Sequence, residues 1–326
     1  MGGNVAALKL FLLAPLASFL AFWFVPAPPR DPPIVSVLCY HTFDSPKKTP
    51  YTVTRQTFRE QMRYLHVQHI PVIPLPQLID YLHKGDPIPD HSVVVSIDDG
   101  YKTARTKAWP VMKEFGFPFT VFVYPHFIGH ASALTWEDLE VMTKEGVDVE
   151  GHSLTHPLLT HPGKAMNRKD YLAWIDQELQ ESKSQIEAHL RKQVTALAYP
   201  FGGYNELIVE RTRRAGYQGA FTCDDGNVDR FTDPLRINRR LVYRGVRLRE
   251  FANYFRDSPL HLANLSPRDG EHVRGPVSLI RGRVRRVQEV LAGSSQILVD
   301  KLGKRYFRVA IDPKTGVFSI SSAISS

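Results

Sequence analysis

A strand-like segment followed by a helix-like segment recurs about seven times between residues 34 and 255. The strand-like segments are short apolar runs, and the helix-like segments carry apolar residues three to four positions apart. This alternation predicts an α/β fold, a parallel sheet or barrel covered by helices. The expected strands cover residues 34–39, 93–97, 119–123, 147–150, 196–199 and 219–222, and the expected helices cover residues 54–67, 75–83, 107–115, 136–145, 171–190 and 205–215.

Side chains capable of chemistry directly follow several of the expected strands. In parallel barrels the functional groups gather at the carboxyl ends of the strands, where the connecting loops meet. The shared placement therefore predicts a functional site at this edge of the sheet. The residues concerned are His41, Asp98, Asp99, Tyr124, His152, Phe201 and Cys223.

The central strand ends in two adjacent carboxylates, in the sequence Val-Val-Val-Ser-Ile-Asp-Asp-Gly at residues 93–100. Neighbouring residues of a strand point to opposite faces, so Asp98 and Asp99 are expected to aim in different directions. One carboxylate can then hold a metal while the other acts as a base, and Gly100 allows the chain to turn sharply beside them. The alternative is an ordinary Asp-Asp-Gly turn after a core strand.

His152 and His156 lie four positions apart. If they share one helical turn, both imidazoles face the same way and can bind one metal. Together with a carboxylate from a neighbouring strand end they predict a site of two histidines and one carboxylate, which leaves coordination positions open for water and substrate. The alternative is a surface pair without function, since His161-Pro162 repeats part of the local pattern.

The first 33 residues predict export. Residues 1–25 carry one lysine followed by an uncharged, mostly apolar run, which is typical of a signal peptide or an N-terminal signal anchor. Residues 26–33 are a Pro-rich linker that is stiff and extended. We therefore expect the domain at residues 34–264 to lie outside the cytoplasm, in the periplasm or at the cell surface, with the membrane as a partner of the N-terminal segment.

Residues 265–326 differ in character from the rest, with short alternating apolar runs between Gly and Pro positions. They predict a small all-β, immunoglobulin-like unit. This unit carries 11 Lys and Arg against 5 Asp and Glu, an excess of six within a net charge of +8 for the whole chain. The excess indicates attachment to an anionic surface or polymer, or alternatively an edge strand protected from aggregation by charge.

The absence of certain motifs and the low cysteine count argue against nucleic-acid-binding proteins and against disulfide-rich proteins. No zinc-finger spacing, RNA-binding aromatic signature or phosphate-binding glycine loop occurs in the sequence, so nucleic acid is not an expected partner. Two cysteines, Cys39 and Cys223, do not make a disulfide framework. We expect free thiols, with a single bridge as the alternative.

Three motifs together resemble the polysaccharide deacetylase family with the NodB-type domain. They are Ser96-Ile97-Asp98-Asp99-Gly100, His152-Ser153-Leu154-Thr155-His156-Pro157 and Ala198-Tyr199-Pro200-Phe201-Gly202. Leu38-Cys39-Tyr40-His41-Thr42-Phe43 and the form of the third motif are similar to exported deacetylases of poly-β-1,6-N-acetylglucosamine, a biofilm polymer. The resemblance spans residues 34–242 and implies a distorted (β/α) barrel that hydrolyses N-acetyl groups with a divalent metal.

The resemblance also implies roles for individual residues. Asp98 is the expected base, and Asp99, His152 and His156 are the expected metal ligands. Zinc is the first choice for such ligands, with cobalt and nickel as alternatives. The backbone N–H of Phe201 is expected to hold the oxyanion. Substrate contacts are expected from Pro200, Tyr199 and Tyr124.

Two departures from the family pattern change these expectations. Many members carry an arginine where this chain has Ala198, so another group must steady Asp98. The late Leu-x-His motif that supplies the acid in many members is also absent from the stretch Arg236-Ile-Asn-Arg-Arg240. We expect His41 to be the acid, with a nearby carboxylate raising its pKa. The alternative for His41 is a packing residue at the strand end.

The sequence thus predicts a metal-dependent N-deacetylase of an extracellular polysaccharide, most simply poly-β-1,6-N-acetyl-D-glucosamine. Two alternatives stay open at this point. One is a deacetylase of another polymer, such as peptidoglycan or chitin. The other is a carbohydrate-binding protein that kept the fold and lost catalysis.

Overall fold

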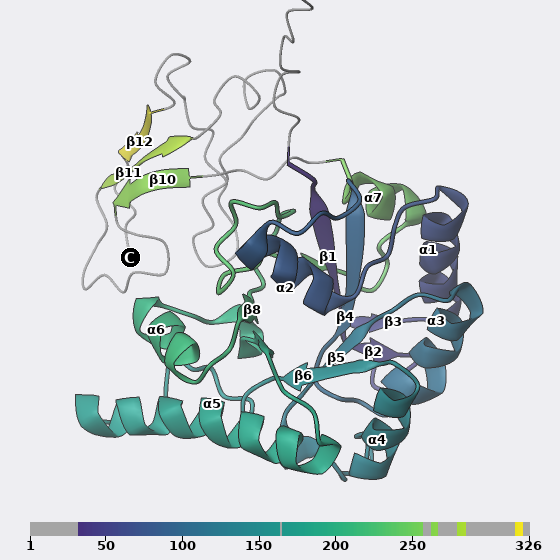
Figure 1. Ribbon diagram of the computed structural model, residues 1–326, viewed down its shortest axis with the longest axis horizontal. Helices are drawn as coiled ribbons and strands as arrows, with labels where there is room; N and C mark the ends of the chain where they lie inside the picture. Colours follow the sequence, from purple (N-terminus) through teal and green to yellow (C-terminus); the bar gives the residue numbers. More distant parts are fainter. Residues whose placement is uncertain (1–31, 164, 257–261, 267–278, 285–316, 322–326) are drawn as a thin grey trace, which may run out of the picture. The chain divides into compact units, whose positions relative to one another are not determined.

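The computed structural model describes residues 32–256 except residue 164, together with residues 262–266, 279–284 and 317–321 (Figure 1). The predicted signal segment at residues 1–25, the linker up to residue 31 and most of the predicted unit at residues 265–326 lie outside the described residues. Among the described residues, no helix combines the length and apolar character needed to cross a membrane.

A parallel sheet of seven strands forms the centre of the fold, in the order β8-β7-β6-β5-β4-β1-β9. All the pairings between neighbouring strands are parallel. The strands are β1 (Val35–Tyr40), β4 (Ser92–Ile97), β5 (Thr120–Val123), β6 (Asp148–Gly151), β7 (Ala196–Ala198), β8 (Gly219–Phe221) and β9 (Arg240–Leu241). A short parallel pair, β2 (Thr42–Phe43) and β3 (Thr52–Val53), follows β1.

Helices connect the strands of the curled sheet (Figure 1). They are α1 (Arg55–Val67), α2 (Leu75–Lys84), α3 (Trp109–Phe115), α4 (Trp136–Lys144), α5 (Arg168–Leu190), α6 (Glu206–Arg214) and α7 (Leu248–Asn253). A π-helical turn at Ala104–Ala108 leads into α3. The helices and strands expected from the sequence are confirmed within a few residues at each end, whereas β2, β3, β9 and α7 were not expected.

Side-chain caps explain where several helices begin. Thr54 accepts a hydrogen bond from the backbone N–H of Thr57 at the start of α1. Thr135 and Asp138 form a reciprocal capping box at the start of α4. Such caps satisfy backbone donors that the first helical turn leaves unpaired.

The two ends of the sheet approach each other through the segment at residues 237–241. Ile237 bridges Phe221 of β8 in parallel, while Arg240 and Leu241 pair with Leu38 and Cys39 of β1. This single segment therefore links β8, at one end of the strand order, to β1, the first strand in the sequence. The arrangement is consistent with the predicted distorted (β/α) barrel.

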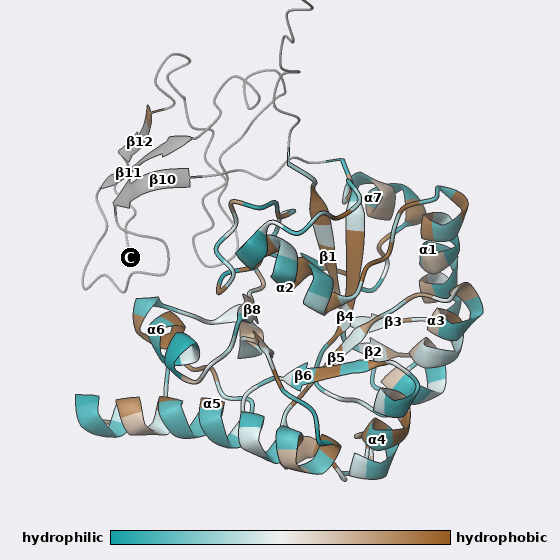
Figure 2. Cartoon of the chain, in the orientation of Figure 1, coloured by the Kyte–Doolittle hydropathy of each residue, from teal (hydrophilic) through white to brown (hydrophobic). Residues whose placement is uncertain are grey.

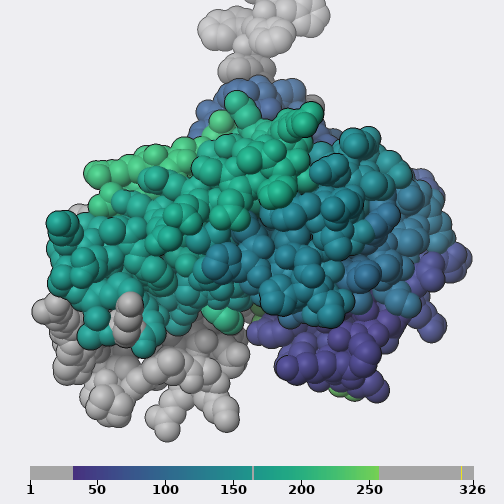
Figure 3. Space-filling view, turned by 90° about the horizontal axis from the view of Figure 1, so that it is seen from below, coloured from purple at the N-terminus to yellow at the C-terminus, as the bar shows by residue number. Residues whose placement is uncertain are grey.

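Two hydrophobic clusters occupy the two faces of the sheet. The larger lies between the sheet and the outer helices and includes Leu38, Val95 and Val149. The smaller joins inward residues such as Val37 and Val94 to α2. In Figure 2 strands β1 and β4 are largely brown, whereas the outer helix α5 is largely teal. In the space-filling view of Figure 3, where the colours give residue number, the teal colours of the middle of the chain, which includes α4 and α5, cover much of the visible face.

Every second residue of β1 and β4 points to the inner face of the sheet, and this series of inward residues ends at the predicted site. On β1 the inward residues Val35 and Val37 belong to the inner cluster, and the same alternation continues through Cys39 to His41. On β4 the series from Val94 runs on to Asp98. Residues that follow these strands therefore gather at one end of the barrel, as predicted.

Three further strands, β10 (Leu262–Ser266), β11 (Leu279–Val284) and β12 (Val317–Ser321), form an antiparallel sheet in the order β10-β11-β12. Strands β11 and β12 lie within residues 265–326, which were predicted to be all-β, and β10 spans the boundary predicted at residues 264 and 265. The immunoglobulin-like arrangement of this part stays a prediction.

Candidate active site

The turn after β4 separates the two carboxylates. The backbone N–H of Asp98 still donates to Tyr40 of β1 at 2.9 Å, so Asp98 continues the strand and its side chain is buried. Asp99 and Gly100 both have left-handed backbone angles, with φ of 74° and 75°. A Cβ at Gly100 would also lie 3.1 Å from the side chain of Val123. The turn therefore requires glycine there and turns Asp99 away from the direction of Asp98.

Asp99 faces two histidines. Its Oδ1 atom lies 3.4 Å from Nε2 of His152 and 3.4 Å from Nε2 of His156. The two Nε2 atoms are 3.2 Å apart. Donor atoms on one tetrahedral zinc, bound at about 2.1 Å, are separated by about 3.4 Å. The three side chains therefore fit a metal, and the predicted ligands are brought together.

The tautomer of His152 also suits a metal ligand. Its Nδ1 atom lies 2.7 Å from the carbonyl oxygen of Ala198, which can only accept, so Nδ1 carries the proton. The Nε2 atom is then left with a free lone pair, as in other histidine ligands held by a carbonyl group. Burial opposes protonation of His152, but the carboxylates of Asp99 and Asp98 outweigh it and raise the pKa of that ring. Burial lowers the pKa of His156 to about 4, so the His156 imidazole is neutral and able to coordinate at neutral pH.

The segment from His152 to His156 is not the helical turn that the spacing suggested. No helix is assigned between these two residues, and Ser153 and His156 have left-handed φ angles of 61° and 59°. The side chain of Ser153 accepts a hydrogen bond from the backbone N–H of His156 at 3.0 Å. A tight, irregular loop therefore brings the imidazoles together.

Glu178 of α5 holds this loop in place. Its buried carboxylate accepts hydrogen bonds from the backbone N–H groups of Leu154 at 3.0 Å and Thr155 at 2.9 Å, and from the Thr155 hydroxyl at 2.6 Å. Charge-assisted bonds of this kind are about twice as strong as neutral ones. Glu178 was not predicted as a site residue, because nothing in the sequence around it distinguishes it from the surface glutamates of a helix.

Arg239 is the partner of Asp98 that the sequence left unidentified. Its Nη1 atom donates to Oδ1 of Asp98 at 2.8 Å, and its Nε atom donates to the carbonyl oxygen of Thr222 at 2.8 Å. The side chain is fully buried. Burial alone would raise the pKa of Asp98, but the positive charge of Arg239 overrides it and holds that pKa well below its usual range. Arg239 therefore occupies the role left vacant by Ala198.

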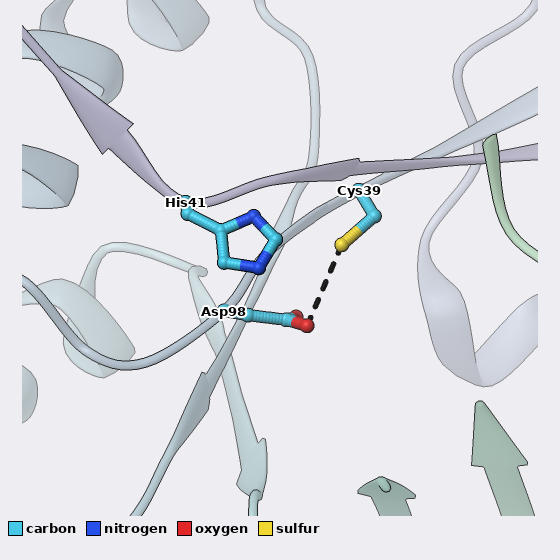
Figure 4. Close-up of side chains that lie close together, drawn as sticks. All are labelled: Cys39, His41 and Asp98. Atoms are coloured by element: carbon cyan, nitrogen blue, oxygen red, sulfur yellow. Dashed lines mark hydrogen bonds between the residues drawn. The ribbon is translucent and has the colours of Figure 1, made fainter. Parts of the chain in front are cut away.

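His41 and Cys39 complete the surroundings of Asp98 (Figure 4). The Cys39 thiol donates to Oδ2 of Asp98 at 3.4 Å, and one ring nitrogen of His41 lies within 4.8 Å of both groups. In the part of the chain that the structure describes, the buried Nδ1 atom of His41 has no hydrogen-bond partner. Cys39 and Cys223 are both free, as expected.

The pKa of His41 differs from the expectation. Burial lowers it, and this effect outweighs the opposite effect of the carboxylates of Asp98 and Asp99. The expectation that a nearby carboxylate raises this pKa was therefore wrong. The ring of Tyr51 lies 4.8 Å from the imidazole of His41, a contact that was not predicted from the sequence.

The third motif places Phe201 beside the metal-ligand group. Phe201 and Gly202 have left-handed φ angles of 57° and 71°, and a Cβ at Gly202 would lie 2.5 Å from Cys223. The exposed ring of Phe201 is 4.6 Å from the His156 ring. Pro200 is buried at the start of this turn.

The two tyrosines predicted to contact substrate differ in position. Tyr124 follows β5, and its ring lies 4.9 Å from the His156 ring, so it borders the site. Tyr199 is fully buried in the outer core, and its hydroxyl donates to the carbonyl oxygen of Leu235 at 3.1 Å. The expectation that Tyr199 contacts substrate was therefore wrong, because its side chain points to the helix-covered face of the sheet.

Backbone strain is concentrated at the site. Of the eight non-glycine residues with positive φ in the described part of the chain, four belong to it: Asp99, Ser153, His156 and Phe201. Left-handed angles in such residues persist where the surrounding structure imposes them, and they cluster at functional sites.

Comparisons with known proteins agree with this geometry. Residues 85–220 match the family model described as polysaccharide deacetylase. The poly-beta-1,6-N-acetyl-D-glucosamine N-deacetylase of Staphylococcus epidermidis is 30% identical over 202 residues, covering 59% of this chain and 68% of the relative.

Solved structures share the fold. The deacetylase PplD of Streptococcus pyogenes, in complex with acetate, superposes with a TM-score of 0.62 at 21% identity, covering 69% of this chain and 99% of that one. IcaB from Ammonifex degensii superposes with a TM-score of 0.60 at 22% identity, covering 69% of this chain and 98% of that one. The family match, the named N-deacetylase relative and the shared fold together show that this chain belongs to the polysaccharide deacetylase family of enzymes.

Proposed function

We propose that this enzyme hydrolyses N-acetyl groups of an extracellular polysaccharide, poly-β-1,6-N-acetyl-D-glucosamine in the first instance. One observation carries the proposal. Two adjacent aspartates have separate surroundings, since Asp98 is paired with Arg239 beside His41, while Asp99 faces His152 and His156. This division matches the needs of metal-assisted amide hydrolysis, in which a base and a metal ligand act side by side.

Asp99, His152 and His156 would hold a divalent metal, with zinc as the first choice and cobalt or nickel as alternatives. When bound, such a metal polarises the amide carbonyl and lowers the pKa of water from 15.7 towards about 7. The ligands themselves are prepared by the hydrogen bond from His152 to Ala198 and by the anchoring of their loop on Glu178.

Asp98 takes the proton of the attacking water. Arg239 keeps the carboxylate ionised at neutral pH, so it is ready to accept a proton, and the thiol of Cys39 orients its second oxygen. The water oxygen forms a bond to the carbonyl carbon of the acetamide, and the bond from that carbon to the amide nitrogen weakens. Arg239 acts through Asp98 and is therefore a positioning residue.

His41 gives a proton to the departing amine nitrogen, so the C–N bond breaks to acetate and a free amino sugar. Its ring lies within reach of the same space as Asp98 (Figure 4). The backbone N–H of Phe201, at the strained turn after β7, would hold the oxyanion, and Tyr124 borders the site beside His156.

The substrate and the location are inferred from separate observations. The name of the Staphylococcus epidermidis relative supports the β-1,6-linked polymer. The apolar run at residues 1–25 supports export to the periplasm or cell surface, either as a cleaved signal peptide or as a membrane anchor. The basic composition of residues 265–326 supports attachment to an anionic surface.

Acetate release from β-1,6-linked and β-1,4-linked N-acetylglucosamine oligomers tests this function, with bound metal measured in the same samples. We expect release from the β-1,6 series, loss of release after chelation and recovery on adding back zinc, cobalt or nickel. Preference for the β-1,4 series would instead indicate a chitin-like or peptidoglycan-like substrate. Oligomer binding without acetate release under any metal would indicate a carbohydrate-binding protein.

A further inference from the structure

Two exposed tyrosines pack against each other, with tilted rings, near the candidate active site. Tyr51 is 39% exposed and Tyr243 is 43% exposed, and their ring centroids are 5.5 Å apart with an angle of 37° between the planes. We call this pair the tyrosine platform. Tyr51 immediately precedes β3 and Tyr243 follows β9 by one residue, so the fold brings together segments far apart in the sequence.

The backbone beneath the platform is fixed. The N–H of Arg244 donates to the carbonyl oxygen of Pro50 at 2.6 Å, which ties the two segments together. The N–H of Val242 donates to the carbonyl oxygen of Cys39 at 3.0 Å, and Val242 is buried. The rings are therefore presented by anchored backbone, and a ligand that contacts them has little conformational entropy to remove.

The platform continues the active site. The ring of Tyr51 is 4.8 Å from the ring of His41, the proposed acid. Beside the metal-ligand group, the ring of Phe201 is 66% exposed and 4.6 Å from His156. Exposed aromatic rings thus lie beside both the acid and the metal ligands, which is the placement expected for a chain-like ligand that extends past the reacting unit.

Polar partners are available next to the platform. Thr52 and Arg244, each the residue after a platform tyrosine, line a cavity of about 290 Å³ together with Asp44 and Lys48. The hydroxyl of Thr52 is buried and already bonded to Thr42. The charged side chains of Asp44, Lys48 and Arg244 supply hydrogen-bond donors and acceptors of the kind that sugar hydroxyl groups need. Ligand sites in proteins combine an apolar contact surface with a few such polar groups.

We propose that the tyrosine platform binds one pyranose ring of the polysaccharide, next to the unit whose acetyl group is removed. The axial C–H bonds of a β-linked pyranose form an apolar face that packs against an aromatic ring, while its hydroxyl groups stay at the edge. This inference rests on the proposed function, since it assigns the neighbouring unit of the same substrate. It implies that the enzyme acts better on oligomers than on single sugars.

The test compares Tyr243→Ala, Tyr243→Phe and Tyr243→Trp with the unsubstituted protein. Tyr243 is preferred to Tyr51 because it does not contact His41. Phe231→Ala is the matched control: Phe231 is also exposed, but it is close in sequence to Val228, which bridges Val35 at the opposite end of β1. The substrates are β-1,6-linked N-acetylglucosamine oligomers of one to five units.

For oligomers of three or more units we expect Tyr243→Ala to raise KM about 3- to 10-fold with little change in kcat, the effect of one lost aromatic contact. Tyr243→Phe and Tyr243→Trp keep a ring and should retain the low KM, and Phe231→Ala should match the unsubstituted protein. An unchanged KM in Tyr243→Ala, or an equal rise in Phe231→Ala, overturns the platform.

Binding of the same oligomers, measured by calorimetry, tests the role of the tyrosine platform independently of the proposed function. If the unsubstituted protein releases no acetate, the proposed function fails, yet weaker oligomer binding by Tyr243→Ala alone still supports the platform. If acetate is released and Tyr243→Ala binds oligomers as tightly as the unsubstituted protein, the function stands and the platform is refuted.

Discussion

Arg239→Met should make the enzyme lose most of its activity at acid pH, with a smaller loss towards neutral pH. Methionine has a similar length but no charge, so the buried Asp98 loses the guanidinium 2.8 Å from its Oδ1 atom. Without the charge of Arg239, the effect of burial on the pKa of Asp98 is less opposed. Burial raises the pKa of a carboxyl by up to about 3–5 units. If the pKa of Asp98 rises to about 6, only about one tenth of the base is ionised at pH 5, and activity there falls about tenfold.

The same substitution should lower stability in a defined pH range. In the unsubstituted protein the pKa of Asp98 is depressed, so its ionisation stabilises the fold above the unfolded pKa of about 3.9 and this contribution is lost as the pH falls through the folded value. Removing one partner of a buried ion pair costs about 3–5 kcal/mol of unfolding free energy. The difference between variant and unsubstituted protein should therefore be largest at pH 7 and shrink as the pH falls below the raised pKa of Asp98 in the variant.

The assay is the pH profile of kcat/KM for acetate release, with thermal unfolding measured at pH 4 and pH 7. Arg240→Met is the matched control, because Arg240 is also buried and pairs with Asp225 at 2.7 Å rather than with Asp98. We expect the acid limb to move to higher pH in Arg239→Met alone. An acid limb at the same pH in Arg239→Met and the unsubstituted protein would refute the role of Arg239.

Four further substitutions test the other parts of the site. His41→Ala should lower kcat about 100- to 10,000-fold with bound metal unchanged. It should also remove an alkaline limb that lies below the ordinary histidine pKa of about 6.5, because burial lowers the pKa of His41 and the acid must be protonated to act. Near-full activity with the same profile would place the acid elsewhere. Asp98→Asn should abolish turnover and keep the metal, whereas Asp99→Asn should lose the metal; equal metal loss in both would show that the roles are wrongly assigned. Glu178→Ala should weaken metal affinity about 10- to 100-fold, measured as metal retained after dialysis, whereas the exposed Glu181→Ala on the same helix should retain it.

Local patterns were enough to predict most of the fold. The period of the apolar residues separates strands from helices, since the two elements repeat their faces every 2 and about 3.6 residues. Because parallel strands end at a common edge, Asp98, Asp99, His152 and His156 were placed together without knowledge of the packing. Their chemical type and the motifs around them then pointed to a metal and a base.

Other features depended on contacts that no local pattern records. Arg239 lies 141 positions from Asp98 in the sequence, and only the closure of the sheet through residues 237–241 brings them together. Glu178 resembles any helical glutamate until α5 packs against the histidine loop. The irregular backbone of that loop is likewise imposed by Glu178 and Ser153 rather than by helical spacing.

Burial decided the remaining differences. Tyr199 follows a strand, as the other site residues do, but its side chain falls on the helix-covered face and packs in the core. The pKa of His41 is lowered because loss of water around the imidazole outweighs the nearby carboxylates. The sequence by itself therefore determined which elements form and which residues reach the end of the barrel. The tertiary structure alone decided their partners, their directions and their charges, because these depend on distances and solvent exposure created by the packing of distant segments.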